Sequence, residues 1–332
     1  MKLPFEQRQQ EIITKKETKT NPEYGKEPSK RTIQELLSTG IIILNKPSGP
    51  TSHQAVDYLK KILNIKKAGH SGTLDPGVTG VLPIALSTAT RITNCLLTAG
   101  KEYVCLMHLH KPIKEEEIKK IFDEHFTGEI EQLPPVKSAV KRRMRKRTIY
   151  YIDIIEIKGQ DVLFKVGCEA GTYIRKLIHD YGEKAGVGAH MAELIRTKAG
   201  PFQEKEMNTL QDIADAYHYY REGNSEPLKN IIKPVEQGTQ HLKKIYVHDG
   251  AVDTLCHGAF LKVPGISKLD SDIKKGDTVA IMTLKNELIL IGEALLNTNN
   301  LVKLAKSIAV KTEQVFMKPG TYPKQTQPYS NH

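Results

Sequence analysis

The sequence has little of what marks membrane-spanning, secreted or metal-bound proteins. No stretch approaches the roughly 20 consecutive apolar residues that cross a bilayer, and the N-terminus has no apolar segment typical of a secretory signal. The four cysteines, Cys95, Cys105, Cys168 and Cys256, are scattered and form no C-x-x-C pair, which argues against a zinc site or a disulfide framework. Scattered free thiols suit a reducing compartment, so we expect a cytoplasmic protein.

Motifs of several common enzyme classes are also missing. The chain contains no G-x-G-x-x-G and no G-x-x-x-x-G-K-[ST], which argues against the usual dinucleotide and P-loop sites. It has no H-x-E with P-C-x-x-C, so zinc-dependent deamination of bases is not expected. Ser71 follows His70 directly, but sequence neighbours rarely align for proton transfer, and no third member of a triad is evident.

What the sequence does contain is a large excess of positive charge. The 332 residues include 49 Lys and Arg against 38 Asp and Glu, which gives a net charge of +11 and a pI near 9.2. Such a charge attracts polyanions, namely RNA, DNA or an anionic membrane surface, and charge alone does not choose among them. The length suggests about two domains, and 39% hydrophobic residues are enough for globular cores.

The N-terminal half alternates between periodic segments and one long irregular stretch. Residues 1–36 are polar and lysine-rich and indicate an extended arm. Residues 40–44 form a short apolar run typical of a buried strand, and residues 52–64 have the apolar period of a helix. Residues 67–91 are rich in Gly, Thr and Pro, and we expect a long loop there, which in a compact domain is more often functional than accidental.

The remaining elements suggest a mixed domain followed by a second, smaller one. We expect strands at 103–109, 149–157 and 162–168, a surface helix at 115–126, and a helix capped by Thr172. Residues 205–240 are polar and helical in character and suggest a linker. Short β-type runs separated by Pro-Gly and Gly-Asp turns predict a small β-barrel over 244–320; the runs are 245–247, 260–263, 278–283 and 287–291.

The loop from Gly69 to Pro76 is the best candidate for a reactive site. Its glycines permit backbone geometry closed to other residues, and Pro76 biases Asp75 toward an extended conformation, in which a carboxylate can face a pocket. The alternative is an ordinary turn in which Asp75 caps backbone N–H groups, and for an isolated Asp-Pro that alternative is favoured.

Two basic features accompany this loop. Arg175 lies in the first turn of a predicted helix, where the helix dipole does not stabilise a cation. It therefore needs a partner, and a buried carboxylate is a good candidate because arginine binds it through two hydrogen bonds. The alternative is an ordinary surface arginine. Six of the seven residues from Lys141 to Arg147 are basic, which indicates a polyanion-binding loop, with a solvated loop or a nuclear address as alternatives.

Taken together, these segments resemble the TruB family of pseudouridine synthases. GIIILNKPSGPTSH (40–53) resembles the family's first motif, and GHSGTLDPGVTGVLPIAL (69–86) resembles the second, in which Asp75 occupies the place of the catalytic aspartate. GKEYVC (100–105) resembles the segment of the active-site tyrosine, here Tyr103. GTYIRKLIHDYGEKAGVGAHMAELIRTKAGPF (171–202) resembles the third motif, with Arg175 and Leu194 at the motif positions.

The sequences of these motifs resemble the dyskerin-like branch, which is the catalytic subunit of H/ACA ribonucleoproteins, more closely than bacterial TruB. HGAFLKVPGI (257–266) and KKGDTVAI (274–281) resemble a PUA domain, and the absence of long lysine-rich tails resembles the compact archaeal form. One departure is Ile195-Arg196, where the family has two basic residues; the second basic position is kept, so the departure concerns only a local RNA contact.

The resemblance implies an α+β fold, in which a mixed, largely antiparallel sheet with surrounding helices is joined to the PUA barrel. The expected domains are an N-terminal arm that packs on the PUA domain (1–36), the catalytic domain (37–240), the PUA domain (241–320) and a C-terminal tail (321–332). The implied partners are H/ACA guide RNA, rRNA, tRNA, a zinc-ribbon-related peptide, a glycine-arginine-type β-barrel protein and a kink-turn binder. One copy of the chain per complex is expected.

The implied reaction is the cofactor-free isomerisation of uridine to pseudouridine. Asp75, Tyr103 and Arg175 are its expected catalytic residues. The residues expected to bind RNA are His70, Lys46, Leu194, Lys141, Arg142, Arg143 and Arg145. The leading hypothesis is a guided rRNA enzyme that also acts on the T-loop uridine of tRNA; the alternatives are a stand-alone tRNA enzyme and a catalytically inert RNA-binding scaffold.

Overall fold

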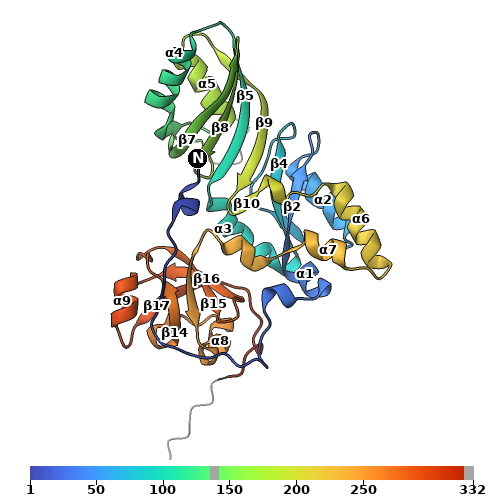
Figure 1. The fold of residues 1–332 in the computed structure, drawn as a ribbon, viewed down its shortest axis with the longest axis vertical. Coiled ribbons are helices and arrows are strands. Elements are labelled where there is room, and N and C mark those ends of the chain that lie inside the picture. The colour runs from blue at the N-terminus through green and yellow to red at the C-terminus, as the bar shows by residue number, and fades with distance from the viewer. Residues whose placement is uncertain (135–141, 325–332) are drawn as a thin grey trace, which may run out of the picture. The chain divides into compact units, whose positions relative to one another are not determined.

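The computed structural model describes residues 1–134 and 142–324, and its chain divides into two units. The large unit comprises Met1–Gln7, Ile42–Leu86 and Ile92–Ile232, and the small unit comprises Arg8–Ile41, Ser87–Arg91 and the described residues from Lys233 onward. The chain therefore passes between the units several times, and each unit gathers segments that are far apart in the sequence (Figure 1).

The large unit is built on a sheet in which seven strands follow the order β2-β4-β9-β5-β8-β7-β6, with β3 and β10 added beside β4 and β9. Strand β5 pairs antiparallel with both β8 and β9, whereas β4 and β9 run parallel. The strands are β2 (Gly40–Lys46), β3 (Ala68–His70), β4 (Thr79–Leu86), β5 (Lys101–Leu109), β6 (Gly128–Gln132), β7 (Arg145–Lys158), β8 (Asp161–Cys168), β9 (Ala189–Ala199) and β10 (Phe202–Gln203).

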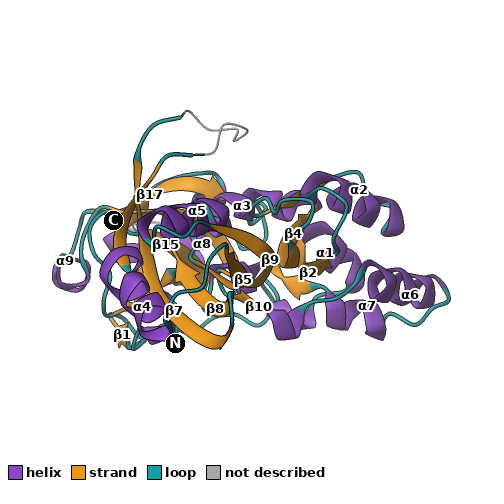
Figure 2. Cartoon of the chain, turned by 90° about the horizontal axis from the view of Figure 1, so that it is seen from above, coloured by secondary structure: helices purple, strands orange, loops and turns teal. Residues whose placement is uncertain are grey.

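Helices accompany this sheet, as Figures 1 and 2 show. The helices are α2 (Ser52–Ile62), α3 (Thr93–Thr98), α4 (Glu115–Ile121), α5 (Ile174–Lys184), α6 (Leu210–Arg221) and α7 (Glu226–Ile231). Helix α2 begins with the expected capping box, because the Thr51 hydroxyl accepts from the Gln54 backbone N–H and the Gln54 side chain accepts from the Thr51 N–H.

Helices α4 and α5 pack on the sheet through an aromatic cluster. Phe122, just after α4, lies 5.0 Å from the ring of Phe164 on β8 and 4.4 Å from the ring of Tyr181 on α5, measured between ring centroids. Phe126 lies 5.6 Å from Tyr181 in the same way. Aromatic rings at these separations contribute both large apolar areas and favourable ring contacts, so this cluster anchors the two helices to β8.

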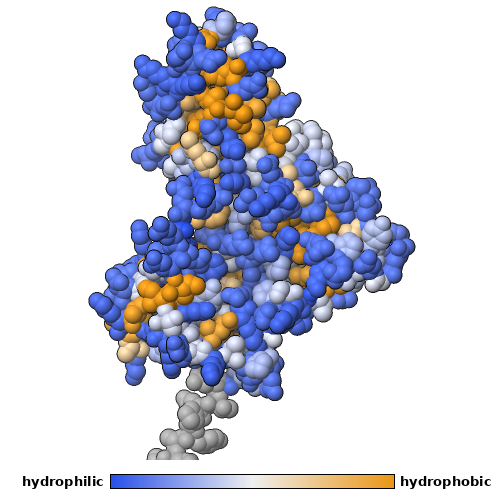
Figure 3. All heavy atoms as spheres, in the orientation of Figure 1, coloured by the Kyte–Doolittle hydropathy of each residue, from blue (hydrophilic) through white to orange (hydrophobic). Residues whose placement is uncertain are grey.

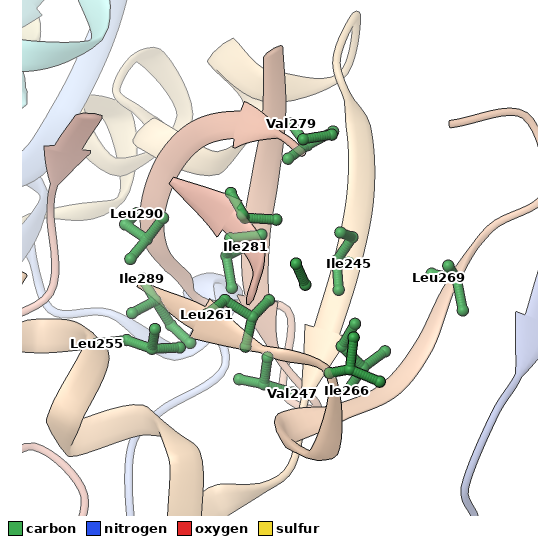
Figure 4. Close-up of a cluster of buried hydrophobic side chains, with 14 of the residues drawn as sticks. Ile245, Val247, Leu255, Leu261, Ile266, Leu269, Val279, Ile281, Ile289 and Leu290 are labelled. Carbon is green, nitrogen blue, oxygen red and sulfur yellow. The ribbon is translucent and has the colours of Figure 1, made fainter. Parts of the chain in front are cut away.

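The small unit is a seven-stranded sheet in the order β1-β14-β12-β15-β16-β17-β13. Its strands are β1 (Ile12–Thr14), β12 (Lys243–Val247), β13 (Leu261–Lys262), β14 (Ile266–Asp270), β15 (Thr278–Thr283), β16 (Leu288–Ala294) and β17 (Ile308–Val315), and its helices are α1 (Ile33–Thr39), α8 (Asp249–Cys256) and α9 (Thr298–Lys303). Short β11 (Lys233–Pro234) pairs with the start of β2. Figure 4 shows the aliphatic core, in which Val247, Ile281 and Ile289 are fully buried.

The N-terminal segment is attached to both units. Within the small unit, β1 pairs with β14, and the Lys15 ammonium donates to three carbonyls at the end of α9, with distances of 2.7, 2.8 and 3.0 Å. Within the large unit, Leu3 is fully buried and Glu6 pairs with Lys198 at 3.0 Å. The expected single arm over 1–36 is therefore divided, because its first seven residues belong to the large unit.

Several expected elements differ from the observed ones. Residues 67–91 are not wholly irregular, since they contain β3 and β4; Pro83 interrupts the strand signal of β4 in the sequence, although the strand is buried. Thr172 does not cap α5, because the N-cap is Tyr173 and the Thr172 hydroxyl donates to the Glu169 carbonyl. The expected linker holds α6 and α7, which belong to the large unit.

Polar side chains cover most of the surface visible in Figure 3. Apolar side chains gather over the upper part of the large unit in that view, and an exposed patch of this kind is typical of a binding face. Within the described residues, no helix has the length and apolar character that a membrane crossing requires.

The aromatic cluster predicts a large effect for one core substitution. Phe122 is 1% exposed, so Phe122→Ala should lower the free energy of unfolding by about 3–5 kcal/mol through lost burial and the cavity left behind. The matched control is Ile155→Ala on β7, where the side chain is 53% exposed and the expected change is below about 0.5 kcal/mol. Urea-induced unfolding measures both, and equal losses would contradict this assignment of the core.

Candidate active site

Asp75 lies in the loop between β3 and β4, and its neighbours on both sides are fixed by hydrogen bonds. The Ser52 hydroxyl, at the start of α2, accepts from the Leu74 N–H at 2.9 Å and donates to the Leu74 carbonyl at 3.1 Å. On the other side, the Gly49 N–H donates to the Pro76 carbonyl at 3.0 Å. The first sequence motif thus holds the second in place, and Ser52 is a positioning residue that the sequence analysis missed.

Lys46 is fully buried beneath the same loop. Its ammonium donates to the carbonyls of Pro47, Pro76 and Val78 at 2.9, 3.0 and 3.0 Å, so all three of its N–H donors are used by backbone. Burial lowers the pKa of Lys46, and the nearby positive charge of Arg196 lowers it further. The expectation that Lys46 binds substrate is corrected accordingly: its donors face the loop backbone, and its role is to hold the turn after Asp75.

The Asp75 carboxylate forms an ion pair with the Arg175 guanidinium. Arg175 is the second residue of α5, so the cation that the helix dipole disfavours does find a carboxylate partner, as expected. The pair is not buried, however, because the two side chains are 53% and 60% exposed. An ion pair this exposed contributes about 0–1 kcal/mol to stability, so its value lies in orienting the carboxylate.

Gln132, at the end of β6, fixes the start of α5. Its side-chain amide donates to the Tyr173 carbonyl at 3.2 Å and accepts from the Tyr173 N–H at 3.0 Å. Tyr173 is the N-cap of α5, so this two-point contact sets where the helix begins and where Arg175 points. Gln132 is 2% exposed, and its role gave no signal in the sequence beyond a polar residue in a predicted domain.

Tyr103 and Leu194 lie on adjacent strands. Tyr103 on β5 is opposite Arg196 on β9, and Leu194 is opposite Cys105, two pairs further along. Both side chains are half-buried and pack against the core of the large unit. Burial raises the pKa of Tyr103, although the positive charge and hydrogen bond of Arg196 oppose the shift, so the Tyr103 hydroxyl keeps its proton at neutral pH.

Arg196 is the basic position of the third motif that this chain keeps, and it is buried. It is 1% exposed, so it makes no RNA contact at the surface. Its Nε donates to the Val81 carbonyl at 2.7 Å and its Nη2 to the Gly72 carbonyl at 3.2 Å. Its burial follows from the position of β9 between β4 and β5. This strand order is not visible in the sequence.

His70 lies at the edge of the loop, on β3. Its ring meets that of His53 edge-on at 4.8 Å between centroids, and its Nδ1 is buried without a hydrogen-bond partner among the described residues. Burial lowers the pKa of His70 to about 4, and the charges of His53 and Arg196 contribute. The imidazole is therefore neutral at physiological pH and presents the uncharged face of its ring to its neighbours.

The basic run is only partly a loop. Lys141 lies outside the described residues, and Arg142 and Arg143 are exposed. Arg145 begins β7, which pairs with β6; the next two basic residues also belong to that strand and form ion pairs with Glu129 and Glu169. The expectation of one continuous RNA-binding loop is corrected, because its second half is sheet and part of its charge is neutralised.

The arrangement brings a carboxylate, its orienting cation, a protonated phenol and an aliphatic side chain to one sheet and the loops at its ends. A carboxylate oriented by an arginine serves as a nucleophile or a base, and a phenol serves as a stacking surface and a proton carrier. The expected catalytic residues Asp75 and Arg175 are in contact, whereas Tyr103 lies opposite Arg196, which donates to Gly72 in the loop of Asp75.

Four family models match the chain. They are the TruB family pseudouridylate synthase N-terminal domain over residues 60–174, the tRNA pseudouridylate synthase B C-terminal domain over 175–240, the PUA domain over 243–316 and the DKCLD (NUC011) domain over 1–56. These matches confirm the expected α+β fold with a C-terminal PUA domain, which corresponds to the small unit's strands β12–β17.

Relatives match along nearly the whole chain. A protein of Methanopyrus kandleri named "Probable tRNA pseudouridine synthase B" is 54% identical over 97% of this chain and 95% of its own length, and one of the same name from Pyrococcus abyssi is 53% identical over 97% of each. Among solved structures, a chain in a Cbf5-Nop10-Gar1 complex is 52% identical with a TM-score of 0.93, covering 97% of this chain and 98% of that one. A chain from an H/ACA RNP bound to a substrate RNA containing 2'-deoxyuridine is 49% identical with a TM-score of 0.91, covering 97% and 99%.

The lowered pKa of His70 predicts how stability depends on pH. In the unfolded chain a histidine takes up its proton below about pH 6.5, whereas the native His70 stays neutral until about pH 4. The unfolded state therefore binds more protons across this window, and His70 makes the free energy of unfolding fall as the pH decreases from 6.5 to 4. His70→Asn should flatten that fall in urea titrations, with His179→Asn on exposed α5 as the control, and an unchanged slope in His70→Asn would contradict the assignment.

Proposed function

The chain belongs to the TruB family of pseudouridylate synthases and is an RNA pseudouridine synthase, and we propose that it works as the catalytic subunit of an H/ACA guide-RNA ribonucleoprotein. The observation that carries the proposed chemistry is the Asp75–Arg175 ion pair, which joins the second and third family motifs in space. The proposed targets are uridines of rRNA selected by the guide RNA and the T-loop uridine of tRNA.

The proposed partners follow from the similar structures. Those structures contain Nop10, Gar1 and an H/ACA RNP with substrate RNA, and the matches cover 97% of this chain. The corresponding partners of this chain are a zinc-ribbon-related peptide, a glycine-arginine-type β-barrel protein, a kink-turn binder and the guide RNA, with one copy of the chain in each complex. The apolar surface in Figure 3 supports protein partners on the large unit.

The proposed division of labour follows the domains. Residues 37–240 carry catalysis, and residues 241–320 hold the 3′ ACA end of the guide. The part of the N-terminal arm after Gln7 supports the PUA domain through β1. All four cysteines are buried free thiols, which supports a cytoplasmic location.

Pseudouridine formation breaks the bond between C1′ and N1 of uridine and makes a bond between C1′ and C5. The proton on C5 leaves, and N1 gains a proton, so atoms and charge balance with no external group and no net redox change. Asp75 attacks C1′, attacks C6 of the ring, or removes the 2′ proton to give a glycal, and each route starts from an ionised carboxylate. Arg175 keeps that carboxylate charged and oriented.

The target base must leave its stack to reach Asp75, at a cost of about a few kcal/mol. Tyr103 stacks on the flipped base and assists proton transfer at C5, and Leu194 closes the opposite face. Neutral His70 occupies the vacated space or contacts the RNA backbone. Because Asp75 is 53% exposed, the bound nucleotide itself excludes water from the carboxylate.

The alternatives are a stand-alone tRNA enzyme and a catalytically inert RNA-binding scaffold. The names of the relatives support a stand-alone tRNA enzyme, whereas the likeness to chains from H/ACA assemblies supports the guided form. A catalytically inert RNA-binding scaffold has no use for a paired Asp75 and Arg175, so the ion pair argues against that alternative.

Asp75→Asn tests the proposed catalysis directly. The substitution keeps the shape of the side chain but removes its charge, and it should lower tritium release from 5-tritiated uridine in RNA by at least about 10³-fold. The control is Asp57→Asn on the exposed face of α2, which should leave the rate within twofold. An Asp75→Asn variant as active as wild type would show the catalytic assignment to be wrong.

The same assay separates the candidate functions. Wild type is tested on bare tRNA and on an rRNA fragment, the latter with and without an H/ACA guide and partner proteins. Release from rRNA only in the presence of the guide is the result expected for the guided enzyme. Release from bare tRNA alone would favour the stand-alone enzyme, and no release under any condition would favour the scaffold.

The exposed arginines of the basic run predict a salt-dependent effect on RNA affinity. Arg142→Ala with Arg143→Ala removes two cations proposed to lie near phosphates, so the slope of log K against log salt should become shallower by about 1.5–2 units, whatever the RNA sequence. Replacing Lys119 and Lys120 on α4 by alanine is the charge-matched control, expected to change the slope little. Equal slopes for the two double variants would contradict an RNA contact at this run.

A further inference from the structure

We propose that Arg196 is a positioning residue for the isomerisation, which couples the backbone of the Asp75 loop to the Tyr103 hydroxyl. The inference rests on the proposed function, since it deepens the account of the same site. It begins from an unusual observation: Arg196 is the largest fully buried side chain of the described protein, and no described carboxylate pairs with it.

A buried cation without an anion is costly. Two more buried cations, Lys46 and Lys101, lie close enough that the charge of Arg196 lowers the pKa of each, and burial lowers the pKa of Lys101 to about 7. Removing charges from water without pairing them is among the most unfavourable arrangements in a protein interior. Apolar residues of similar volume would fill the same space at less cost, so packing alone does not account for this cluster.

The contacts of Arg196 show which segments this buried cation holds together. Strand β9 lies between β4, which follows the Asp75 loop, and β5, which carries Tyr103. From this central position the guanidinium donates to the Gly72 carbonyl inside the loop and to the Val81 carbonyl on β4, and Tyr103 is the residue opposite Arg196 on β5. One rigid planar group therefore links three segments, and only arginine offers donors that diverge in one plane in this way.

The local backbone is shaped around this residue. Gly80 has a φ of +103°, and a Cβ placed there would lie 2.3 Å from the Arg196 carbonyl oxygen, so β4 approaches β9 as closely as the chain allows. Gly72 has a φ of +119°, and a Cβ there would lie 3.5 Å from the Arg196 Nη1 atom. Gly80 thus lets β4 lie against the backbone of Arg196, and Gly72 lies beside its guanidinium, so the backbone ahead of Asp75 is tied to β9 and through it to the strand of Tyr103.

The consequence for the reaction is geometric and electrostatic. Asp75 and Tyr103 act on the same nucleotide, one on the sugar or ring and the other on the C5 proton, so their separation must be held closely for both to act. Arg196 also opposes the rise that burial produces in the pKa of Tyr103, which keeps the phenol nearer to the range useful for proton transfer.

A double-variant cycle tests the coupling. Arg196→Met and Tyr103→Phe should each lower the single-turnover rate of tritium release by at least tenfold, while KM for the RNA changes less than threefold. Because the two residues act as one unit, the double variant should be no more than about threefold slower than the slower single variant. Fully multiplicative losses would overturn the proposal.

Thr197→Val provides the matched control. Thr197 is the next residue on β9 and is 6% exposed, and its hydroxyl donates to Glu102 at 2.8 Å, away from the Asp75 loop. This variant loses a buried hydrogen bond on the same strand, so it should lower the melting temperature, leave the rate within twofold and combine multiplicatively with Tyr103→Phe. A rate loss in Thr197→Val as large as in Arg196→Met would reduce Arg196 to a structural residue and overturn the proposal.

A second measurement does not depend on activity. Amide hydrogen exchange over residues 71–81 should quicken at least tenfold in Arg196→Met and Arg196→Gln but not in Thr197→Val, because the clamp on Gly72 and Val81 is lost. If Arg196→Met does not fold, Arg196→Lys carries the test: it retains the charge but not the planar fork of donors, and it should recover part of the rate. Unchanged exchange would overturn the clamp, whereas a wild type without tritium release would instead refute the proposed function.

Discussion

The site depends on one physical arrangement: buried cations that bind backbone carbonyls rather than carboxylates. Asp75 lies on a loop with little regular structure, and such a loop has no hydrogen-bond ladder to fix its course. Lys46 donates hydrogen bonds to the Pro76 and Val78 carbonyls after Asp75, and Arg196 donates one to the Gly72 carbonyl before it. Charged donors bind carbonyls about twice as strongly as neutral ones. A few such hydrogen bonds therefore fix the course of the loop, although it pairs with no strand.

This arrangement separates stability from catalysis in the large unit. The aromatic cluster around Phe122 and the apolar faces of β5 and β8 supply the burial that folds the unit. The polar contacts near Asp75 contribute little net stability, since each exchanges water for protein and the ion pair to Arg175 is half-exposed. Loss of one of these polar residues is therefore expected to disturb geometry before it unfolds the chain.

Much of the fold followed from local patterns in the sequence. The apolar run at 40–44, the capping box of Thr51 and Gln54 and the hairpin between β7 and β8 all rest on interactions between near neighbours, which sequence period reveals. The sequence also suggested a carboxylate partner for Arg175, because the helix dipole disfavours a cation in the first turn, but a surface arginine remained the alternative until the ion pair with Asp75 was seen. The sequence did not indicate how exposed the pair would be, since exposure depends on distant segments.

What could not be predicted shares one cause, namely burial set by long-range strand order. Nothing in the sequence indicates that Arg196 is buried, yet it is interior because β9 lies between β4 and β5. Gln132 and Ser52 resemble ordinary polar residues, yet each binds both the N–H and the carbonyl of one backbone residue, Tyr173 or Leu74, within two positions of Arg175 or Asp75. A polar side chain that binds both the N–H and the carbonyl of one residue makes the hydrogen bonds that a neighbouring strand would otherwise make. Such contacts fix a functional loop that does not join the sheet.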